Sequence, residues 1–290
     1  MKILLLGKTG QVGFELHRSL SSLGTVIAPG RAELDLHKEH AVANYLAYTK
    51  PSMIVNAAAW TAVDAAEGKK NEAERLNTGL PAQLAQYAAA NSARLFHYSS
   101  DYVYPGNGEM PWKENSDTGP LSHYGKTKLK GDEAIEQSSA DYVIFRTSWV
   151  YSARGSNFMK TMLRLAKSKS ELSIVADQIG APTPARLIAQ VTTLAIHRQL
   201  RKGLYHLVPK GETSWYGFAQ EIFLLAQKNG EQLTISPDNV YPIPTSDYPT
   251  PATRPLNSRM EATKLETALS IQLPDWQSQL ELTLCEYLEK

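Results

Sequence analysis

A tyrosine and a lysine four residues apart are the first pair in this sequence that could do chemistry together. Tyr124 and Lys128 stand in a segment of helical period, and a spacing of four places two side chains on one face of a helix. A phenol is a poor acid or base at neutral pH until a nearby cation stabilises its phenolate. The pair therefore predicts acid–base catalysis in which Tyr124 exchanges a proton and Lys128 lowers its pKa.

The apolar run before this helix ends in further reactive side chains, Ser100 and Asp101. Ligands bind at the carboxyl ends of parallel strands, so Ser100 can donate to a substrate carbonyl beside Tyr124. The tyrosine–lysine spacing is expected about once by chance, but the complete serine–tyrosine–lysine set is far more specific. It predicts ketone reduction. His97 is left outside this chemistry, because a lone strand histidine is more often a packing residue.

A glycine-rich turn predicts where a dinucleotide would bind. Gly7, Gly10 and Gly13 stand between the predicted strand Ile3–Leu6 and the predicted helix Gln11–Leu23. Glycines allow a tight turn and close approach to a pyrophosphate, and the helix amino terminus supplies free N–H groups. The spacing is G-x-x-G-x-x-G rather than the stricter G-x-G-x-x-G, so turn chemistry without a ligand is the alternative.

The residues after the second predicted strand bear on the choice of cofactor. Arg31 follows Val26–Ala28, and no acid stands there before Glu33. An arginine suits the 2′-phosphate of NADPH and an acid suits NADH, so NADPH is expected, with NADH as the alternative. A solvated surface arginine is the other interpretation of Arg31. Asp35 follows at a distance that suits the adenine.

Two further sites follow the third and fifth predicted strands. Ala57 and Ala59 have small side chains that would let the backbone lie close to the cofactor. Trp149 stands just beyond the fifth strand, where an aromatic side chain could contact the substrate.

Apolar runs alternate with segments of helical period through the first half of the chain. This alternation predicts an α/β fold with a doubly wound parallel sheet. The expected strands are Ile3–Leu6, Val26–Ala28, Met53–Val55, Leu95–Tyr98 and Tyr142–Phe145, and the expected helices are Gln11–Leu23, Lys38–Tyr48, Asn71–Ala90 and Leu121–Gln137.

The second half follows a looser pattern. Six prolines between positions 237 and 255 exclude a long helix there and predict an ordered loop lining a site, with a solvated linker as the alternative. We expect a dinucleotide-binding domain over 1–150, and over 151–290 a smaller, interleaved substrate-binding lobe with segments that can return to the sheet. The expected elements are helices Asn157–Lys167, Ala185–Arg198 and Ser214–Asn229 and a strand at Leu204–Val208.

Composition excludes several classes of partner. The 30 basic residues are balanced by 29 acidic ones, which argues against nucleic acid and anionic membranes. A single cysteine, Cys285, excludes an internal disulfide framework, and no Cys/His spacing predicts zinc. The apolar start is too short for a secretory signal or a membrane span. A cytoplasmic protein is therefore expected.

Taken together, the motifs resemble the extended short-chain dehydrogenase/reductases, which have a Rossmann-type sheet, and more closely the dTDP-4-dehydrorhamnose reductases. The likeness spans nearly the whole chain. It is carried by Gly7–Gly13, Asn56–Ala59, Thr61–Asp64, His97–Val103, Tyr124–Lys128, Phe145–Tyr151, Gly180–Thr183 and Pro249–Pro255.

The resemblance implies reduction of the C4 ketone of dTDP-4-dehydro-6-deoxy-L-mannose to dTDP-L-rhamnose, a precursor of bacterial surface polysaccharide. It implies that Tyr124 protonates the C4 alkoxide, that Lys128 also holds the nicotinamide ribose, and that Ser100 polarises the ketone. Asp101 and Trp149 would help to seat the sugar. The residues implied to line the cofactor are Gly10, Gln11, Val12, Arg31, Asp35, Leu36, Ala59, Trp60, Thr61 and Tyr98.

Three positions depart from the pattern of the relatives. Ser100 stands where many have threonine, and either hydroxyl can donate. Trp60 replaces a common histidine and could change packing beside the nicotinamide. Some relatives form a magnesium-linked homodimer; Glu15 matches one ligand position, but Arg186 stands where a second acid is expected. Because a cation cannot ligate magnesium, we do not expect that metal-bridged form, and a homodimer of another kind stays open.

Two alternatives to this function remain. The same fold and catalytic set serve reductases and epimerases of GDP-, UDP- or CDP-linked hexoses. Some relatives of the fold are regulatory subunits that bind dinucleotide without turnover, although these usually lose part of the catalytic set, which is complete here.

Overall fold

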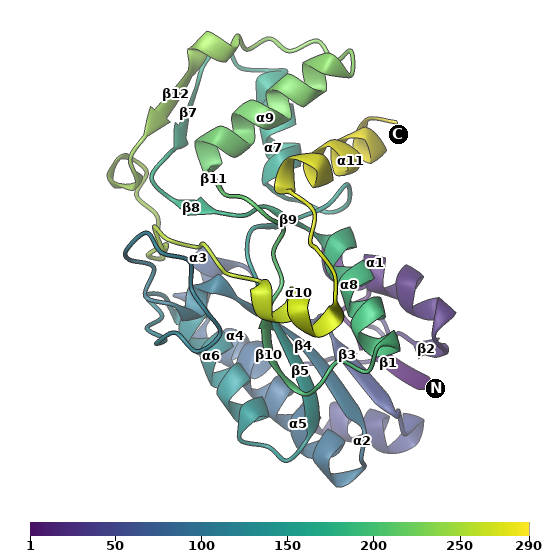
Figure 1. Cartoon of the computed structure of the whole chain (residues 1–290). Helices are drawn as coiled ribbons and strands as arrows, with labels where there is room; N and C mark the ends of the chain where they lie inside the picture. The colour runs from purple at the N-terminus through teal and green to yellow at the C-terminus, as the bar shows by residue number, and fades with distance from the viewer. Residues whose placement is uncertain (290) are drawn as a thin grey trace.

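The main sheet has six parallel strands in the order β10-β5-β4-β3-β1-β2. The computed structural model describes residues 1–289. Within the sheet, Leu6 pairs with Asn56 and Ser100 pairs with Thr147, so the residues that follow β1, β3, β4 and β5 emerge at one edge (Figure 1). The strands are β1 (Lys2–Leu6), β2 (Thr25–Ile27), β3 (Met53–Asn56), β4 (Arg94–Ser100), β5 (Asp141–Thr147) and β10 (Gly203–His206).

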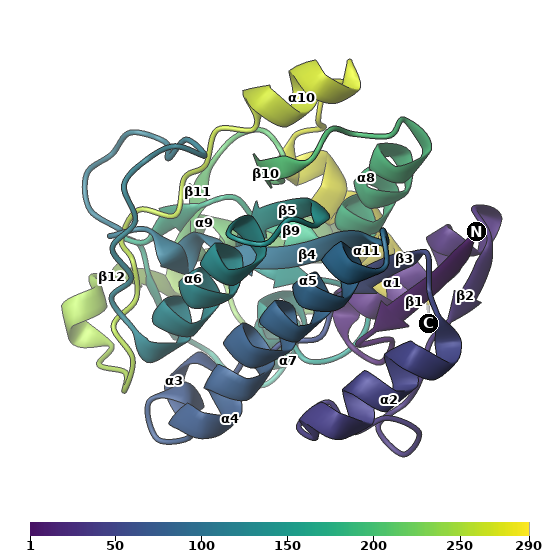
Figure 2. The same cartoon turned by 90° about the horizontal axis from the view of Figure 1, so that it is seen from below.

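Helices cover both faces of the sheet because the strands are apolar on both faces. In β1, Ile3 and Leu5 belong to one buried cluster, and Leu4 and Leu6 belong to another, as the period of two in a strand requires. The predicted doubly wound sheet is confirmed (Figure 2). The first cluster lies under α1 (Gln11–Ser19), α8 (Ala185–His197) and α10 (Thr263–Leu269), and the second under α2 (Glu39–Thr49), α5 (Leu80–Ala90) and α6 (His123–Glu136).

The helix predicted over Asn71–Ala90 is interrupted, and that prediction was wrong in its continuity. The segment consists of α4 (Lys70–Glu74), a π-helical turn at Arg75–Gly79, and α5. The side chain of Asn77 in that turn is fully buried and bonds to Trp60 and Thr127. The wider turn directs this amide inward, a use of π-turns that is common at functional sites.

A second, smaller lobe lies beyond the carboxyl edge of the sheet (Figure 1). Its core comes from aromatic and aliphatic side chains of three helices and a strand pair. Short strand pairs join it to the sheet domain, and α3 (Val63–Ala66) lies on the sheet side. The elements of the lobe and its connections are α7 (Phe158–Ala166), α9 (Trp215–Lys228), α11 (Trp276–Leu288), β7 (Leu172–Val175) with β12 (Val240–Ile243), β6 (Val150–Tyr151) with β9 (Thr183–Pro184), and β8 (Ile179–Gly180) with β11 (Thr213–Ser214).

Parts of the second half return to the sheet. β10 pairs with β5, α8 packs on α1, and α10 contributes Leu265 and Leu269 to the core on that face. The chain therefore crosses between sheet and lobe more than once. No helix within residues 1–289 has both the length and the apolar character needed to cross a membrane.

Candidate functional site

The turn after β1 has the geometry of an anion-binding loop. Gly7 has φ +85°, and a Cβ there would lie 2.7 Å from the backbone of Ala57, so only glycine fits. A Cβ on Gly13 would lie 2.0 Å from the Gly7 carbonyl oxygen. Helix α1 starts at Gly10 without a side-chain cap, which leaves its first-turn N–H groups for an anion. These features fit the pyrophosphate of a dinucleotide.

A pocket beside this turn gathers several of the predicted cofactor residues. Lys8 also lies there, and its Nζ is 3.6 Å from a carboxylate oxygen of Glu33. Arg31 lines the same pocket and is exposed, so a charged phosphate in the pocket could reach it. The lining residues are Leu6, Gly7, Lys8, Thr9, Pro29, Gly30, Arg31, Leu34, Asp35, Leu36, His37 and Leu76.

The amino terminus of α1 also contacts the smaller lobe. The Asn157 side-chain amide donates to Gln11 Oε1 at 2.8 Å and to the Ser152 carbonyl at 2.7 Å. The guanidinium of Arg154 lies 3.7 Å from the centre of the Phe14 ring. The loop after β6 thus packs on Gln11 and Phe14 of α1, next to the predicted pyrophosphate site.

The loop after β3 is held in place by the buried amide of Asn77. Asn77 Oδ1 accepts from the Trp60 backbone N–H at 2.9 Å, and its Nδ2 donates to the Trp60 carbonyl at 3.1 Å and to Thr127 Oγ1 at 3.1 Å. This contact joins the loop of Ala57, Trp60 and Thr61 to helix α6. The sequence does not indicate a role for Asn77, because a polar residue inside a helical pattern gives no sign of which way its side chain points.

Helix α6 presents Tyr124 from its first turn. Ser122 caps the helix by accepting from the Gly125 N–H at 3.2 Å. Burial raises the pKa of Tyr124 above its ordinary value, and hydrogen bonding to Ser100 opposes that shift. The structure therefore brings Tyr124 and Ser100 together, as predicted from the sequence, and keeps the phenol protonated.

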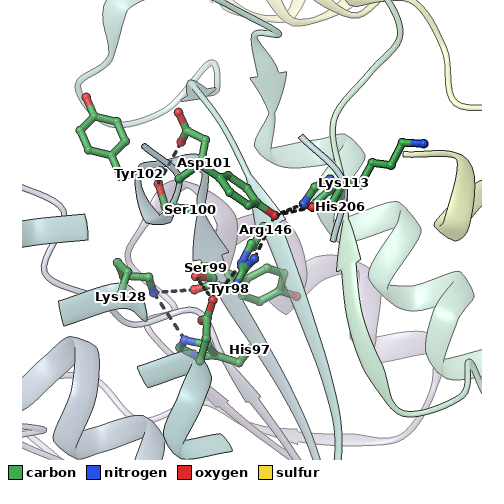
Figure 3. Close-up of polar contacts among 12 residues, drawn as sticks. His97, Tyr98, Ser99, Ser100, Asp101, Tyr102, Lys113, Lys128, Arg146 and His206 are labelled. Carbon is green, nitrogen blue, oxygen red and sulfur yellow. Dashed lines mark hydrogen bonds and ion pairs between the residues drawn. The ribbon is translucent and has the colours of Figure 1, made fainter. Parts of the chain in front are cut away.

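Lys128 lies one turn further along α6 and is 2% exposed. Its Nζ donates to the Tyr98 carbonyl at 2.6 Å and lies 3.4 Å from His97 Nε2 (Figure 3). Burial lowers the pKa of Lys128 to about 8, and the charge of Asp132 opposes that shift. Lys128 is thus directed at β4.

Ser100 and Asp101 lie where β4 ends. Ser100 Oγ donates to Asp101 Oδ1 at 2.9 Å and accepts from the Tyr102 N–H at 3.2 Å. Burial raises the pKa of Asp101 to about 6, although hydrogen bonds from Ser258 and Ser100 oppose the shift. To donate to a ketone, the Ser100 hydroxyl must turn away from Asp101.

Trp149 has a backbone conformation that is unusual for a bulky residue. Its φ is +48°, in the left-handed region that large side chains rarely adopt outside functional sites. Its ring stacks on Trp215 of α9 with centroids 3.7 Å apart, and Trp215 Nε1 donates to Gln178. Trp149 thus lies at the junction of the sheet domain and the lobe.

Tyr98 differs from the other residues predicted to line the cofactor. The Thr192 hydroxyl donates to the Ile188 carbonyl at 2.7 Å, so the Tyr98 hydroxyl, 2.9 Å from Thr192 Oγ1, acts as the donor. The Tyr98 side chain therefore points into the core under α8, and only its backbone carbonyl faces Lys128.

A salt bridge joins two of the sequence blocks across the gap between sheet and lobe. Arg254 Nη2 lies 2.8 Å from Asp64 Oδ2, and the Ala252 N–H donates to Asp64 Oδ1 at 3.1 Å. The proline-rich segment is thus an ordered loop at this point. Both blocks can be recognised in the sequence, but their pairing cannot, because 190 residues separate the partners.

Arg186 lies between two carboxylates. Its Nη2 is 2.7 Å from Glu286 Oε2, and its Nε is 3.4 Å from Glu15 Oε2. The resemblance implies a second acidic magnesium ligand at position 186. The guanidinium of Arg186 stands there instead and pairs with Glu15 and Glu286. Across residues 1–289, no group of three or more His, Cys, Asp or Glu side chains is placed to hold a metal ion.

Comparison with known proteins identifies the family. Residues 1–289 match the family model described as RmlD substrate binding domain. The chain is 47% identical over 290 residues to a dTDP-4-dehydrorhamnose reductase of Escherichia coli K12, covering 96% of this chain and 95% of that protein. It is 42% identical over 298 residues to a reductase of the same name from Burkholderia thailandensis, covering all of both chains.

Solved structures agree with the sequence relatives. A dTDP-4-dehydrorhamnose reductase of Clostridium acetobutylicum superposes with a TM-score of 0.92 at 34% identity and full coverage of both chains. One from Bacillus anthracis, solved in complex with NADP, superposes with a TM-score of 0.91 at 31% identity, covering 98% of this chain and 99% of that one. The chain therefore belongs to the dTDP-4-dehydrorhamnose reductase family.

Proposed function

We propose that this protein reduces the C4 ketone of dTDP-4-dehydro-6-deoxy-L-mannose to dTDP-L-rhamnose with NADPH as the hydride donor and NADH as an alternative. The observation that carries the proposal is the position of Tyr124 beside Ser100, one helical turn from the buried Lys128, at the sheet edge that carries the glycine turn. Membership of the reductase family supports the substrate.

The dinucleotide supplies the hydride when bound. We infer that its pyrophosphate lies on the turn of Gly7, Gly10 and Gly13, where α1 offers free N–H groups. Arg31, Asp35 and the rest of the neighbouring pocket would hold the adenosine half. The loop that Asn77 fixes would then lie beside the nicotinamide half.

Tyr124 is the proposed proton donor. Its raised pKa keeps the phenol protonated in the resting protein, as a donor to a developing alkoxide requires. A phenol buried in this way is a weak acid, so it needs positive charge nearby at the moment of transfer. Lys128 is the cation proposed to supply that charge, and its effect on the Tyr124 pKa stays a prediction.

Ser100, Asp101 and Trp149 are proposed to seat the sugar. The Ser100 hydroxyl, once turned from Asp101, would donate to the ketone oxygen from the side of β4. Trp149 presents its ring where the lobe meets the sheet. We further propose that the lobe around α7, α9 and α11 forms the substrate side, and that the protein acts in the cytoplasm.

The decisive test is an assay of purified protein with NADPH and the dTDP-linked ketosugar, following the loss of reduced-nicotinamide absorbance. Turnover of that substrate, with far slower turnover of GDP- and UDP-linked ketosugars, is the expected result. Faster turnover of another nucleotide sugar would assign a different substrate, and dinucleotide binding without any turnover would favour a regulatory subunit.

Tyr124→Phe tests the proton donor. The variant should lose roughly 10²–10⁴-fold in kcat and should still bind NADPH, as measured by fluorescence titration. Tyr205→Phe is a matched control, because Tyr205 lies on β10 and its hydroxyl donates to the Arg201 carbonyl. A Tyr124→Phe variant as active as this control would refute the assignment.

Arg31→Ala tests the choice of cofactor. Loss of a charge-assisted contact to the 2′-phosphate should weaken NADPH by roughly tenfold and leave NADH nearly unchanged. Dissociation constants for both dinucleotides provide the measurement. Equal changes for both would mean that Arg31 is only a solvated surface residue.

A further inference from the structure

Three buried polar side chains form a chain from β3 to the catalytic helix. Asn56 ends β3, His97 lies on β4 and Lys128 lies on α6, and they are 1%, 1% and 2% exposed. Asn56 Nδ2 lies 3.1 Å from His97 Nδ1, and His97 Nε2 lies 3.4 Å from Lys128 Nζ. In Figure 3, the imidazole of His97 faces the Lys128 amine from below. The proposed function uses only the last of the three.

The orientation of the Asn56 amide is determined by a backbone contact. Asn56 Oδ1 lies 3.2 Å from the backbone N–H of Ala58, and an N–H can only donate. The oxygen must therefore face Ala58, which leaves the NH₂ group facing His97. Turning the amide over would place two N–H donors against each other in a buried site, at substantial cost.

The tautomer of His97 follows from that orientation. Because Asn56 Nδ2 is a donor, His97 Nδ1 must accept and carries no proton. Burial and the nearby charge of Lys128 hold the pKa of His97 well below its ordinary value, so the ring is neutral. Its one proton is then on Nε2, which faces Lys128.

An ammonium group can only donate hydrogen bonds. An Nε2–H that faces Lys128 therefore disfavours the ammonium form of Lys128. It favours the neutral amine, whose lone pair can accept the hydrogen bond. The other groups around Lys128 act in both directions. The Tyr98 carbonyl and the charge of Asp132 favour the ammonium. Arg146 pairs with the same carboxylate, and its positive charge reduces the stabilisation that Asp132 gives to the Lys128 ammonium.

We propose that His97, held by Asn56 in its Nε2–H tautomer, is a positioning residue that favours the neutral amine of Lys128 and so sets the pH range in which Lys128 supports Tyr124. The inference rests on the proposed role of Lys128 and deepens it. It also assigns a purpose to His97 and Asn56, which the catalytic set does not include.

Nitrogen-15 NMR of protein labelled in its histidine rings tests the tautomer without any turnover. His97, identified by the signal lost in His97→Met, should be neutral and protonated on Nε2. His206 is an internal reference with the opposite tautomer, because its Nδ1 faces the Glu261 carbonyl and its Nε2 faces the Tyr104 hydroxyl. A proton on Nδ1 of His97 would overturn the proposal.

Asn56→Asp tests the effect on Lys128. A carboxylate cannot donate to Nδ1, so the His97 proton should move to Nδ1 and leave Nε2 to accept from the ammonium. The titration of Lys128, followed by the nitrogen-15 shift of Nζ, should then move to higher pH by roughly one unit. The basic limb of the kcat/KM profile should move in the same direction.

Asn56→Asp changes the tautomer of His97 and also adds a negative charge. The variant His97→Met separates these two effects, and it also provides the test if Asn56→Asp does not fold. It removes the Nε2–H donor without adding a charge, and Lys128 should again titrate at higher pH. An unchanged Lys128 titration in folded variants would overturn the proposal. Failure of the dTDP-sugar assay would count against the proposed function alone, since both NMR readouts are independent of turnover.

Discussion

The charge of Asp132 acts on two buried cations, Arg146 and Lys128, which differ in how they are paired. Arg146 Nε lies 3.0 Å from Asp132 Oδ2, and its Nη1 donates to the Tyr104 hydroxyl at 2.9 Å. Lys128, four residues before Asp132 on α6, donates to the Tyr98 carbonyl. Asp132 Oδ2 also accepts from the Ser99 hydroxyl at 2.8 Å.

Pairing decides which cation can titrate. Burial would lower the pKa of Arg146, but the charge of Asp132 and the contacts with Tyr104 outweigh it and raise the pKa above its ordinary value. The pKa of Lys128 is lowered to about 8, because burial outweighs the more distant attraction of Asp132. Arg146 is therefore a permanent structural charge, and Lys128 can change its charge near neutral pH.

The largest effect that this comparison predicts is a loss of activity without a loss of stability. Lys128→Met should lower kcat roughly 10²–10⁴-fold, the range of a lost acid–base function. Its free energy of unfolding should stay within about 1 kcal/mol of the parent, because removing a buried charge offsets the lost hydrogen bond. Steady-state kinetics and urea unfolding measure the two quantities. A strongly destabilised variant would make Lys128 a structural residue like Arg146.

The converse substitution should act on stability. Arg146→Met leaves Asp132 buried without its partner, which costs roughly 3–5 kcal/mol. Urea unfolding would measure the loss. Lys228→Met is the control, because that lysine pairs with Glu281 on the surface and should change stability by less than about 1 kcal/mol. If Arg146→Met and Lys228→Met changed the free energy of unfolding equally, the buried ion pair would contribute no more to stability than the surface pair.

Local patterns in the sequence predict part of the site, but they do not reveal the pairs that join distant segments. The strand–turn–helix context of Gly7, the alternation of strands with helices and the Tyr124–Lys128 spacing are local signals. The structure places Gly7 and Tyr124 at one edge of the sheet. The Asn77 amide, the Asp64–Arg254 bridge and the partners of Arg146 depend on contacts between distant segments. No periodicity encodes such contacts.

His97 shows the same limit from another side. A single histidine in a strand is usually a packing residue. Only the hydrogen bonds of His97 to Asn56 and Lys128 distinguish it from such a residue, and the sequence does not reveal them. The helices α10 and α11 were also outside the predictions, because they follow the proline-rich segment, in which the helical pattern is lost.

Asp101 extends the comparison to a buried acid, with a smaller expected effect. Hydroxyl groups hydrogen-bond to it, and its pKa is raised to about 6 from an ordinary value of 3.8. The folded state thus binds a proton more tightly than the unfolded chain, so this group lowers stability as the pH rises from about 4 through 6.

Asp101→Asn removes that charge and should stabilise the protein at pH 8 by about 2–3 kcal/mol, and by less at pH 5. Urea unfolding at the two pH values measures the difference, and kcat/KM should fall if Asp101 seats the sugar. Equal stabilisation at both pH values would show that Asp101, like Arg146, keeps one charge state throughout.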